Sequence, residues 1–312
     1  MKFDYNLLDA TEKIIFALRS VYNDAGYRRY RMAKFEEYDL YSRNKDFLVS
    51  DSVITFTDTS GKLMALKPDV TLSIIKNNRD PDEGVQRLCY NESVYRVSKN
   101  TGNFREIEQT GLECFGDVDT KCISEVLRLA ADSLNTINES FILELSDLDI
   151  FSTFLDRLSA PENTRHSIIR CAGEKNMHGI REVCVEAGIG EEKYAGLIEI
   201  LQLFGSPVSV LPELDKLCIS EKLEGEFTKL KEAVSIFEGG PFEKNIQIDF
   251  SSVGDMNYYN GIVFRGFIEG IPESVLSGGQ YDRLMDRMCR KSKAIGFAVY
   301  LDFLERMQLS GQ

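Results

Sequence analysis

Histidine is scarce in this sequence, and its cysteines are not spaced as metal ligands. Only two histidines occur among 312 residues, and the seven cysteines include no C-x-x-C pair. The sequence therefore offers few residues for a zinc site, a disulfide framework or a histidine-based catalytic pair. We expect reduced thiols and no bound metal. The chain also has no glycine-rich phosphate loop followed by lysine and no G-x-S-x-G motif, the usual signals of P-loop nucleotide-binding proteins and serine hydrolases.

Positive charge and long apolar runs are scarce as well. The chain has 37 Lys and Arg against 50 Asp and Glu, which gives a formal net charge of −13. A surface of this sign disfavours binding to the phosphate backbone of nucleic acid. No apolar run approaches the roughly 20 residues that a membrane span requires, and the N-terminus is acidic. We therefore expect a cytoplasmic protein that binds neither nucleic acid nor a membrane.

The hydrophobic pattern changes twice along the chain. Residues 7–25 have apolar side chains at helical spacing, and alternating patterns typical of strands recur up to about residue 150. From about 151 to 240 the pattern is helical with charged faces, and strand patterns then return. We predict an α+β domain made of residues 1–150 and 241–312, which form one mixed sheet, with residues 151–240 as a helical insertion.

One predicted strand carries polar side chains where a buried strand would carry apolar ones. Alternate residues of a strand share a face, so Gln109, Gly111 and Glu113 lie on the same side of the segment 105–116. Glycine weakens a strand unless something needs the space that it leaves. An amide and a carboxylate on either side of that space suit a small ligand with a cationic group. The alternative is a sheet face exposed to water, which is common in antiparallel sheets.

Three further segments contain candidate polar residues. The segment "LMALKPDVTLSIIKN" places Asp69 and Thr71 at the start of a predicted helix, where a helix cap is the simplest interpretation. The segment "MNYYNGIVFRGF" contains the adjacent residues Tyr258 and Tyr259, and "SGGQYDRLM" has paired glycines before Tyr281. Each segment is a weak signal by itself.

Taken in order, these segments resemble the motifs of histidyl-tRNA synthetases, which are class II aminoacyl-tRNA synthetases. Residues 67–71 resemble the family motif R-P-E/D-x-T, and residues 95–113 resemble F-R-x-E followed by a loop and R-x-F-x-Q-x-G-x-E. Residues 257–265, 278–284 and 294–304 resemble D-Y-Y-x-x-x-V-F-E, G-G-R-Y-D-G-L and A-I-G-F-A-x-G-L-E/D-R-L. The resemblance spans nearly the whole chain, and it implies a class II synthetase-like sheet flanked by helices.

The resemblance also implies a pocket for histidine. Two carboxylates and an amide suit the ammonium group of an amino acid, and tyrosine hydroxyls can pair with imidazole nitrogens. The predicted histidine-binding residues are Asp69, Thr71, Arg96, Gln109, Glu113, Tyr258, Tyr259 and Tyr281. The alternative is that these residues are relics in a collapsed pocket.

The departures from the family pattern fall mostly on groups that synthetases use for ATP. Phe303 replaces an arginine that holds the nucleotide phosphates, and Tyr300 replaces a glycine. Gly254 replaces the arginine before D-Y-Y, Asn257 replaces its aspartate, and Ser98 replaces the glutamate of F-R-x-E. Because catalysis at phosphoryl groups depends on electrostatic positioning, we expect that the chain does not form an adenylate.

The chain ends soon after the last motif, so we expect no anticodon-binding domain. A synthetase core of this kind is similar to the regulatory subunits of ATP phosphoribosyltransferase in histidine biosynthesis. That similarity implies a non-catalytic, cofactor-free homodimer, joined through a first motif at residues 30–41. It also implies assembly with the short-form catalytic subunit, which the dimer activates, and feedback inhibition by L-histidine. Two alternatives stay open, a small amino-acid-adenylating enzyme without tRNA binding and a purely structural scaffold.

Overall fold

The computed structural model describes residues 7–48, 53–98, 101–218, 220–253, 256 and 258–302. Three of the departures from the family pattern, Gly254, Asn257 and Phe303, lie outside these residues. No helix within the described ranges is long and apolar enough to cross a membrane. All seven cysteines are free thiols, and five of them are buried.

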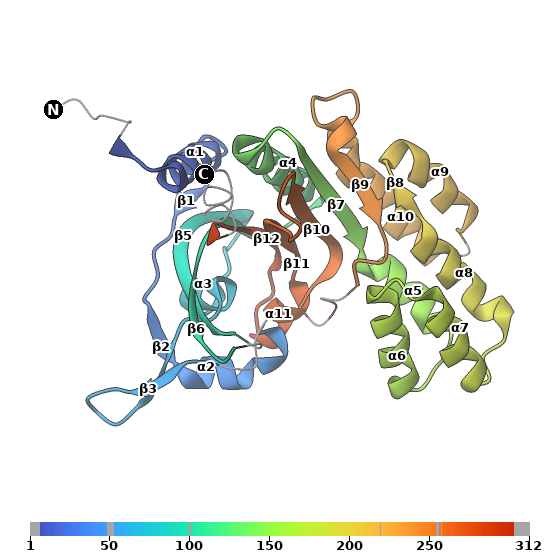
Figure 1. Ribbon diagram of the computed structural model, residues 1–312, viewed down its shortest axis with the longest axis horizontal. Coiled ribbons are helices and arrows are strands. Elements are labelled where there is room, and N and C mark those ends of the chain that lie inside the picture. Colours follow the sequence, from blue (N-terminus) through green and yellow to red (C-terminus); the bar gives the residue numbers. More distant parts are fainter. Residues whose placement is uncertain are drawn as a thin grey trace.

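A nine-stranded mixed sheet runs through the molecule (Figure 1). In spatial order its strands are β1 (Arg28–Arg29), β5 (Val85–Val97), β6 (Phe104–Gly116), β12 (Lys293–Tyr300), β11 (Leu276–Gln280), β10 (Asn260–Ile268), β7 (Phe141–Asp147), β9 (Ile246–Asp249) and β8 (Phe204–Gly205). The pairs β1–β5 and β7–β9 are parallel, and the other neighbouring pairs are antiparallel. The predicted α+β fold is confirmed, and strands from both sides of residues 151–240 share this mixed sheet, although three further strands form a separate small sheet.

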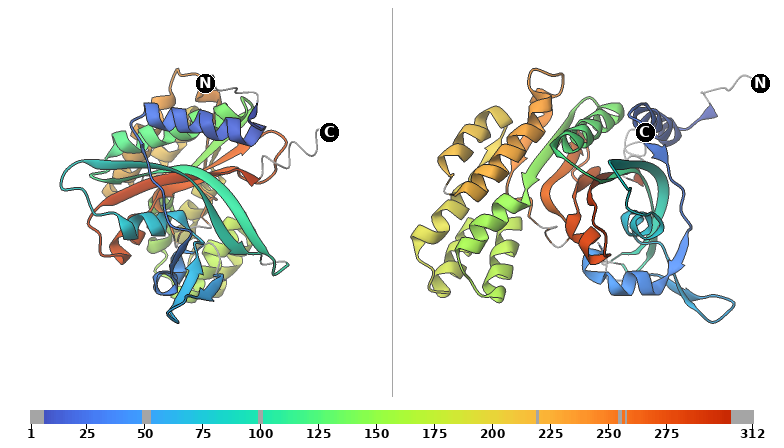
Figure 2. Two further views of the ribbon diagram at one scale, coloured as in Figure 1. Left: turned by 90° about the vertical axis from the view of Figure 1, so that its left-hand side faces the viewer. Right: turned by 180° about the vertical axis from the view of Figure 1, so that it is seen from behind.

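Helices and a small second sheet cover the two faces of this sheet (Figures 1 and 2). One face packs against α1 (Ala10–Asp24) and α4 (Thr120–Ile137). The other face curves around α3 (Val70–Asn77), with α11 (Asp282–Arg287), α2 (Tyr38–Arg43) and η2 (Lys45–Phe47) nearby. The second sheet, in the order β2 (Phe35–Glu37), β4 (Leu63–Leu66), β3 (Thr55–Thr57), lies on this side too.

The two faces of β6 differ as the alternation predicts. Leu112 and Cys114 point into the apolar core beneath α1 and α4. Gln109 and Glu113 point the other way, yet they are only 4% and 2% exposed. The alternative of a water-exposed sheet face is therefore wrong for these residues, and their burial calls for polar partners.

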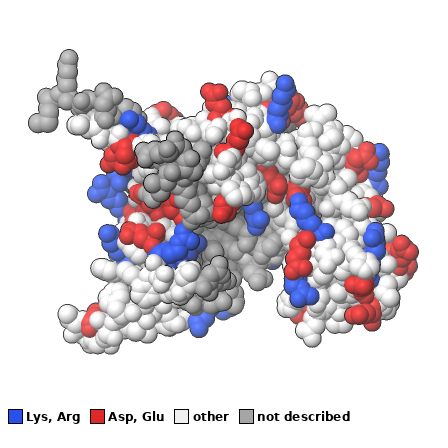
Figure 3. Space-filling view, in the orientation of Figure 1, with Lys and Arg blue, Asp and Glu red and all other residues white. Residues whose placement is uncertain are grey.

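Helices fill the segment between β7 and β9. They are α5 (Leu148–Arg157), α6 (Glu162–Gly173), α7 (Met177–Glu186), α8 (Glu191–Gln202), α9 (Pro207–Lys216), α10 (Glu221–Val234), η3 (Ser235–Phe237) and η4 (Glu243–Asn245). The segment also contributes β8, the edge strand of the main sheet, which the helical pattern does not predict. Acidic and basic side chains are interspersed over these helices on the face shown in Figure 3. Treating this segment as an insertion in a discontinuous domain stays a prediction.

Lys175 links this segment to the sheet. It lies in the turn between α6 and α7, and its Nζ is 2.6 Å from Oδ2 of Asp249 at the end of β9. Asp249 is buried, and its other oxygen accepts hydrogen bonds from the backbone N–H and the hydroxyl of Ser251. The chain continues from Ser251 toward Tyr258 and Tyr259, so the ion pair holds the helices beside the strand that leads to these tyrosines.

Candidate functional site

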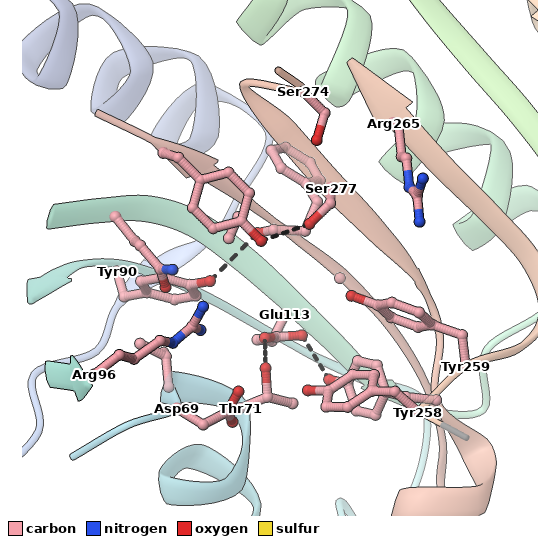
Figure 4. Close-up of a pocket in the computed structure, with 17 residues that line it drawn as sticks. Asp69, Thr71, Tyr90, Arg96, Glu113, Tyr258, Tyr259, Arg265, Ser274 and Ser277 are labelled. Carbon is pink, nitrogen blue, oxygen red and sulfur yellow. Dashed lines mark hydrogen bonds between the residues drawn. The ribbon is translucent and has the colours of Figure 1, made fainter. Parts of the chain in front are cut away.

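A cavity of about 230 Å³ lies over the sheet face that curves around α3 (Figure 4). All eight residues predicted from the sequence line it, namely Asp69, Thr71, Arg96, Gln109, Glu113, Tyr258, Tyr259 and Tyr281. They come from the start of α3, from β5 and β6, and from the segments before β10 and α11. The structure therefore brings them together around an open space, while their role in binding histidine stays a prediction.

Small residues form the floor of the cavity. The strand register places Gly111 of β6 opposite Ala298 of β12, which lies opposite Ser277 of β11. In the next row, Glu113 lies opposite Gly296. A Cβ atom on Gly296 would lie 1.9 Å from Oε2 of Glu113, so the carboxylate can occupy this position only because residue 296 has no side chain. The floor is low because the residues at these positions have small side chains or none.

Glu113 is the central charged group of the cavity. Its Oε1 accepts a hydrogen bond from the hydroxyl of Thr71 at 2.6 Å, and its Oε2 accepts one from the hydroxyl of Tyr281 at 2.6 Å. Burial raises the pKa of Glu113 to about 8, although the two hydroxyls act in the opposite direction, and nearby Asp69 raises it further. A cation in the cavity would stabilise the ionised carboxylate. The site is thus suited to a ligand with a positive group.

Asp69 has two roles in the geometry. It is the N-cap of α3, where its Oδ1 accepts a hydrogen bond from the backbone N–H of Leu72 at 2.8 Å. It also lines the cavity, and burial raises its pKa while hydrogen bonds and the charge of Arg96 lower it. Arg96 donates from Nε to the carbonyl oxygen of Pro68 at 3.2 Å. The cap interpretation is confirmed, and it is compatible with a ligand-binding role.

Three tyrosines form an aromatic wall beside Glu113. The rings of Tyr258 and Tyr259 meet edge to face with centroids 4.6 Å apart, and Tyr281 lies 6.4 Å from Tyr258. Burial and the charge of Glu113 raise the pKa of Tyr281 well above its usual range. Its hydroxyl therefore keeps its proton and acts as a donor to Glu113. Such a wall suits a planar ring with a hydrogen-bonding edge.

Several lining residues escape the sequence argument. Tyr90, Ser277 and Tyr300 line the cavity, as does Arg265 of β10. The hydroxyls of Ser277 and Tyr300 lie 2.6 Å apart and close one side of the space. Tyr300 was noted as a departure from the family pattern, but its contact with Ser277 depends on the pairing of β11 with β12. Strand alternation could have found Tyr90, since it lies opposite Gly111.

Three residues matched to the family motifs at 67–71 and 95–113 lie outside the cavity lining. Arg105 forms an ion pair with Asp302, with Nη2 and Oδ2 2.8 Å apart. Ser98 follows the end of β5 and does not line the cavity. Lys67, in place of the family's arginine, is fully buried and pairs with Glu92 at 2.9 Å. Within the described residues no cluster of three metal-ligating side chains occurs.

Replacing Asp69 separates its two roles. We expect Asp69→Asn to keep the helix cap, with a stability change below about 0.5 kcal/mol, because Asn and Asp cap helices equally well. Asp69→Ala removes the cap and should cost about 1 kcal/mol. Both variants should bind L-histidine more weakly than the native chain. Thermal unfolding and calorimetric titration measure the two effects, and equal stability losses in both variants would contradict the cap assignment.

Comparison with known protein families decides the family. The model of the histidyl-tRNA synthetase family matches residues 7–304. The chain belongs to this family. The resemblance seen in the sequence motifs is thereby confirmed over nearly the whole chain.

Its relatives within this family include proteins named as regulatory subunits. The ATP phosphoribosyltransferase regulatory subunit of Oceanobacillus iheyensis is 26% identical over 294 residues, which cover 93% of this chain and 72% of the relative. A structure from Bacillus halodurans, titled ATP phosphoribosyltransferase regulatory subunit/histidyl-tRNA synthetase, has a TM-score of 0.82 and 24% identity, with 97% and 82% coverage. An ATP phosphoribosyl transferase complex from Thermotoga maritima contains a chain with a TM-score of 0.74 and 18% identity, with 96% and 98% coverage. The two structures share the fold of this chain.

Proposed function

We propose that this chain is a non-catalytic regulatory subunit of ATP phosphoribosyltransferase in histidine biosynthesis. The observation that carries the proposal is the cavity itself. It is lined by all the residues that we predict to bind an amino acid, and Tyr300, which replaces a glycine of the synthetase motif, also lines it and contacts Ser277. Relatives that match over more than nine-tenths of the chain are named as such subunits. We place the protein in the cytoplasm, in contact with neither nucleic acid nor a membrane.

L-histidine is the effector in this proposal. A cavity of about 230 Å³ suits a single amino acid. The carboxylates of Asp69 and Glu113 suit its ammonium group, and the tyrosine wall suits its imidazole. No cofactor is required, because the chain changes the activity of its partner and performs no reaction itself.

The partner is the short-form catalytic subunit of ATP phosphoribosyltransferase. A structure with the same fold occurs in the complex from Thermotoga maritima. Inhibition would follow if histidine binds one arrangement of the assembly more tightly than another. Coupling between two sites is reciprocal, so substrates of the catalytic subunit should weaken histidine binding by the same factor.

A homodimer within this assembly is supported by an exposed apolar surface. Phe35 on β2 and Phe56 on β3, the two strands that flank β4, are 53% and 38% exposed. Their rings meet with centroids 5.3 Å apart. Phe35 belongs to the segment 30–41 that resembles the first class II motif. Because exposed apolar patches are a liability in an isolated chain, we propose that a second copy covers these rings.

The activity of the catalytic subunit tests the proposal. We expect phosphoribosyl-ATP formation to require this chain and to fall at least several-fold when L-histidine is added. Activation without a response to any amino acid would instead favour the scaffold alternative. No activation would overturn the proposal, and amino-acid-dependent exchange of pyrophosphate into ATP would then favour the adenylating enzyme.

A further inference from the structure

The charged residues of the cavity are separated into two groups. Asp69 and Glu113 lie at the end formed by α3 and β6. Arg265 lies on β10, and its guanidinium points toward the cavity from the other side (Figure 4). A ligand that lies between these groups would meet negative charge at one end and positive charge at the other. This is the charge pattern of a zwitterion.

The strand register places Arg265 on the same face as the cavity floor. Gly111, Ala298, Ser277 and Arg265 occupy one cross-strand row on the successive strands β6, β12, β11 and β10. Strands are about 4.8 Å apart, so the row from Gly111 to Arg265 spans about 14 Å between backbones. Arg265 lines the cavity at one end of this row, and Ala298 and Ser277 between it and Gly111 are small enough to leave the space open.

Arg96, the other arginine that lines the cavity, lies at its acidic end. It lies beside Asp69, where its charge lowers the pKa of that carboxyl group, and it donates to the carbonyl oxygen of Pro68. Its charge therefore belongs to the acidic end of the cavity. Arg265 is also a departure from the family motif, because D-Y-Y-x-x-x-V-F-E ends in glutamate where this chain has arginine. The chain thus lacks the arginine at Gly254 but has gained one at the other end of the same motif.

Glu144 is one of the neighbours that compete with a ligand for Arg265. It lies opposite Arg265 on β7, in the same cross-strand row, and its Oε1 accepts a hydrogen bond from Ser252 at 2.8 Å. The charge of Arg265 is among the influences that lower the pKa of Glu144, against the larger effect of burial. Removing this carboxylate should make Arg265 a stronger anion-binding group.

We propose that Arg265 binds the carboxylate of a zwitterionic amino acid whose cationic group faces Asp69 and Glu113. Arg265 thereby selects free amino acids against the corresponding amines and amides. The identity of the amino acid as histidine rests on the proposed function, but the selection for a carboxylate rests on the cavity. A guanidinium is well suited to this task, because it binds carboxylates through two parallel hydrogen bonds.

Titration of the full chain with three probes tests this selection. L-histidine carries the carboxylate, whereas histidinamide and histamine do not. We expect the native chain to bind histidine at least 10-fold more tightly than either of the other probes. Arg265→Gln should lower the affinity for histidine by about 10-fold to 100-fold, as expected for loss of a charged hydrogen-bonded partner. It should change the affinity for histamine by less than about 3-fold. Arg181→Gln, at an exposed position on α7, is the matched control and should keep the native ratio.

A second variant predicts an effect of the opposite sign. Glu144→Gln removes a competing carboxylate, so it should raise the affinity for histidine several-fold and leave the affinity for histamine unchanged. A fold that is merely disturbed would not give this gain. An unchanged ratio of histidine to histamine affinity in Arg265→Gln overturns the proposal, and so does the absence of binding by any of the twenty amino acids. The regulatory proposal fails on a separate measurement, the lack of chain-dependent phosphoribosyl-ATP formation.

Discussion

Replacing Glu113 with Gln is expected to weaken L-histidine binding roughly 30-fold or more. Loss of one partner from a buried charge pair typically costs 2–5 kcal/mol, and Glu113 is 2% exposed. The stability of the ligand-free chain near pH 6 should change far less, because the carboxyl group is then protonated and the amide has nearly the same shape. Titration calorimetry measures the first effect, and thermal unfolding measures the second.

The same variant should remove a pH dependence. The pKa of Glu113 in the folded, ligand-free chain is about 8, against 4.5 for an unperturbed glutamate. The folded chain therefore binds this proton more tightly than the unfolded chain, so its contribution to stability is complete below about pH 4.5 and is lost as the pH rises through 8. Between pH 4.5 and 8 the free energy of unfolding should therefore fall more steeply with pH in the native chain than in Glu113→Gln. The difference in slope should be at most about 1.4 kcal/mol per pH unit.

Ligand binding should show the matching release of protons. An ammonium group beside Glu113 favours the ionised carboxylate, so a proton leaves when the ligand binds near pH 7. Asp69 also has a raised pKa, and Thr71 and Tyr281 are the hydroxyl donors to Glu113. Calorimetry in buffers of different ionisation enthalpy should report close to one proton released by the native chain and fewer by Glu113→Gln. Equal proton release would contradict the assignment to Glu113, and Glu186→Gln on α7 is the exposed control.

Replacing Gly111 with Ala is expected to destabilise the fold by about 2–4 kcal/mol and to abolish ligand binding. A Cβ atom there would lie 2.1 Å from the backbone oxygen of Phe297 and 2.7 Å from the hydroxyl of Tyr90. The first of these atoms belongs to a paired strand and cannot move without disturbing the sheet, so the cost resembles that of overpacking a core. Denaturant unfolding gives the change in free energy.

The control for this variant is a glycine with free space around it. Gly225 lies inside α10, and a Cβ atom there would meet nothing within 4 Å. Gly225→Ala should therefore stabilise the chain by about 0.5–1 kcal/mol, since alanine favours helices more than glycine does. A similar loss of stability in both variants would show that the close contact at Gly111 is not the cause.

Local patterns predicted much of the site because several of its residues depend on one element each. The alternation in β6 placed Gln109 and Glu113 on one face, and the helix start placed Asp69 beside Thr71. Between residues 47 and 57 the same alternation, which reads as one strand, agrees with the structure only in part: η2 ends at Phe47, β3 covers Thr55–Thr57, and residues 49–52 lie outside the described part. Short edge strands leave little periodicity to read.

Local sequence patterns could not predict the contacts between segments that lie far apart in the chain. Arg265 reaches the cavity only because β10 pairs with β11, which in turn pairs with β12 and so reaches β6. The same holds for β8, a two-residue strand that joins the sheet through β9 after four consecutive helices. No spacing in the sequence encodes such pairings. The family motifs identified Tyr258, Tyr259 and Tyr281, which composition and periodicity alone would have left unconnected.

The floor of the cavity is part of a single sheet that reaches both ends of the molecule. A ligand held between β6 and β10 would touch four adjacent strands of the nine. Neighbouring strands are rotated relative to one another by about 20–25°, and this twist accumulates across a sheet. A small change of twist at the floor is therefore multiplied toward the edges, at β1 and at β8 with its attached helices. The occupied and empty states would then differ in how the two rims of the molecule are rotated against each other, which is a difference that a partner spanning both rims can detect.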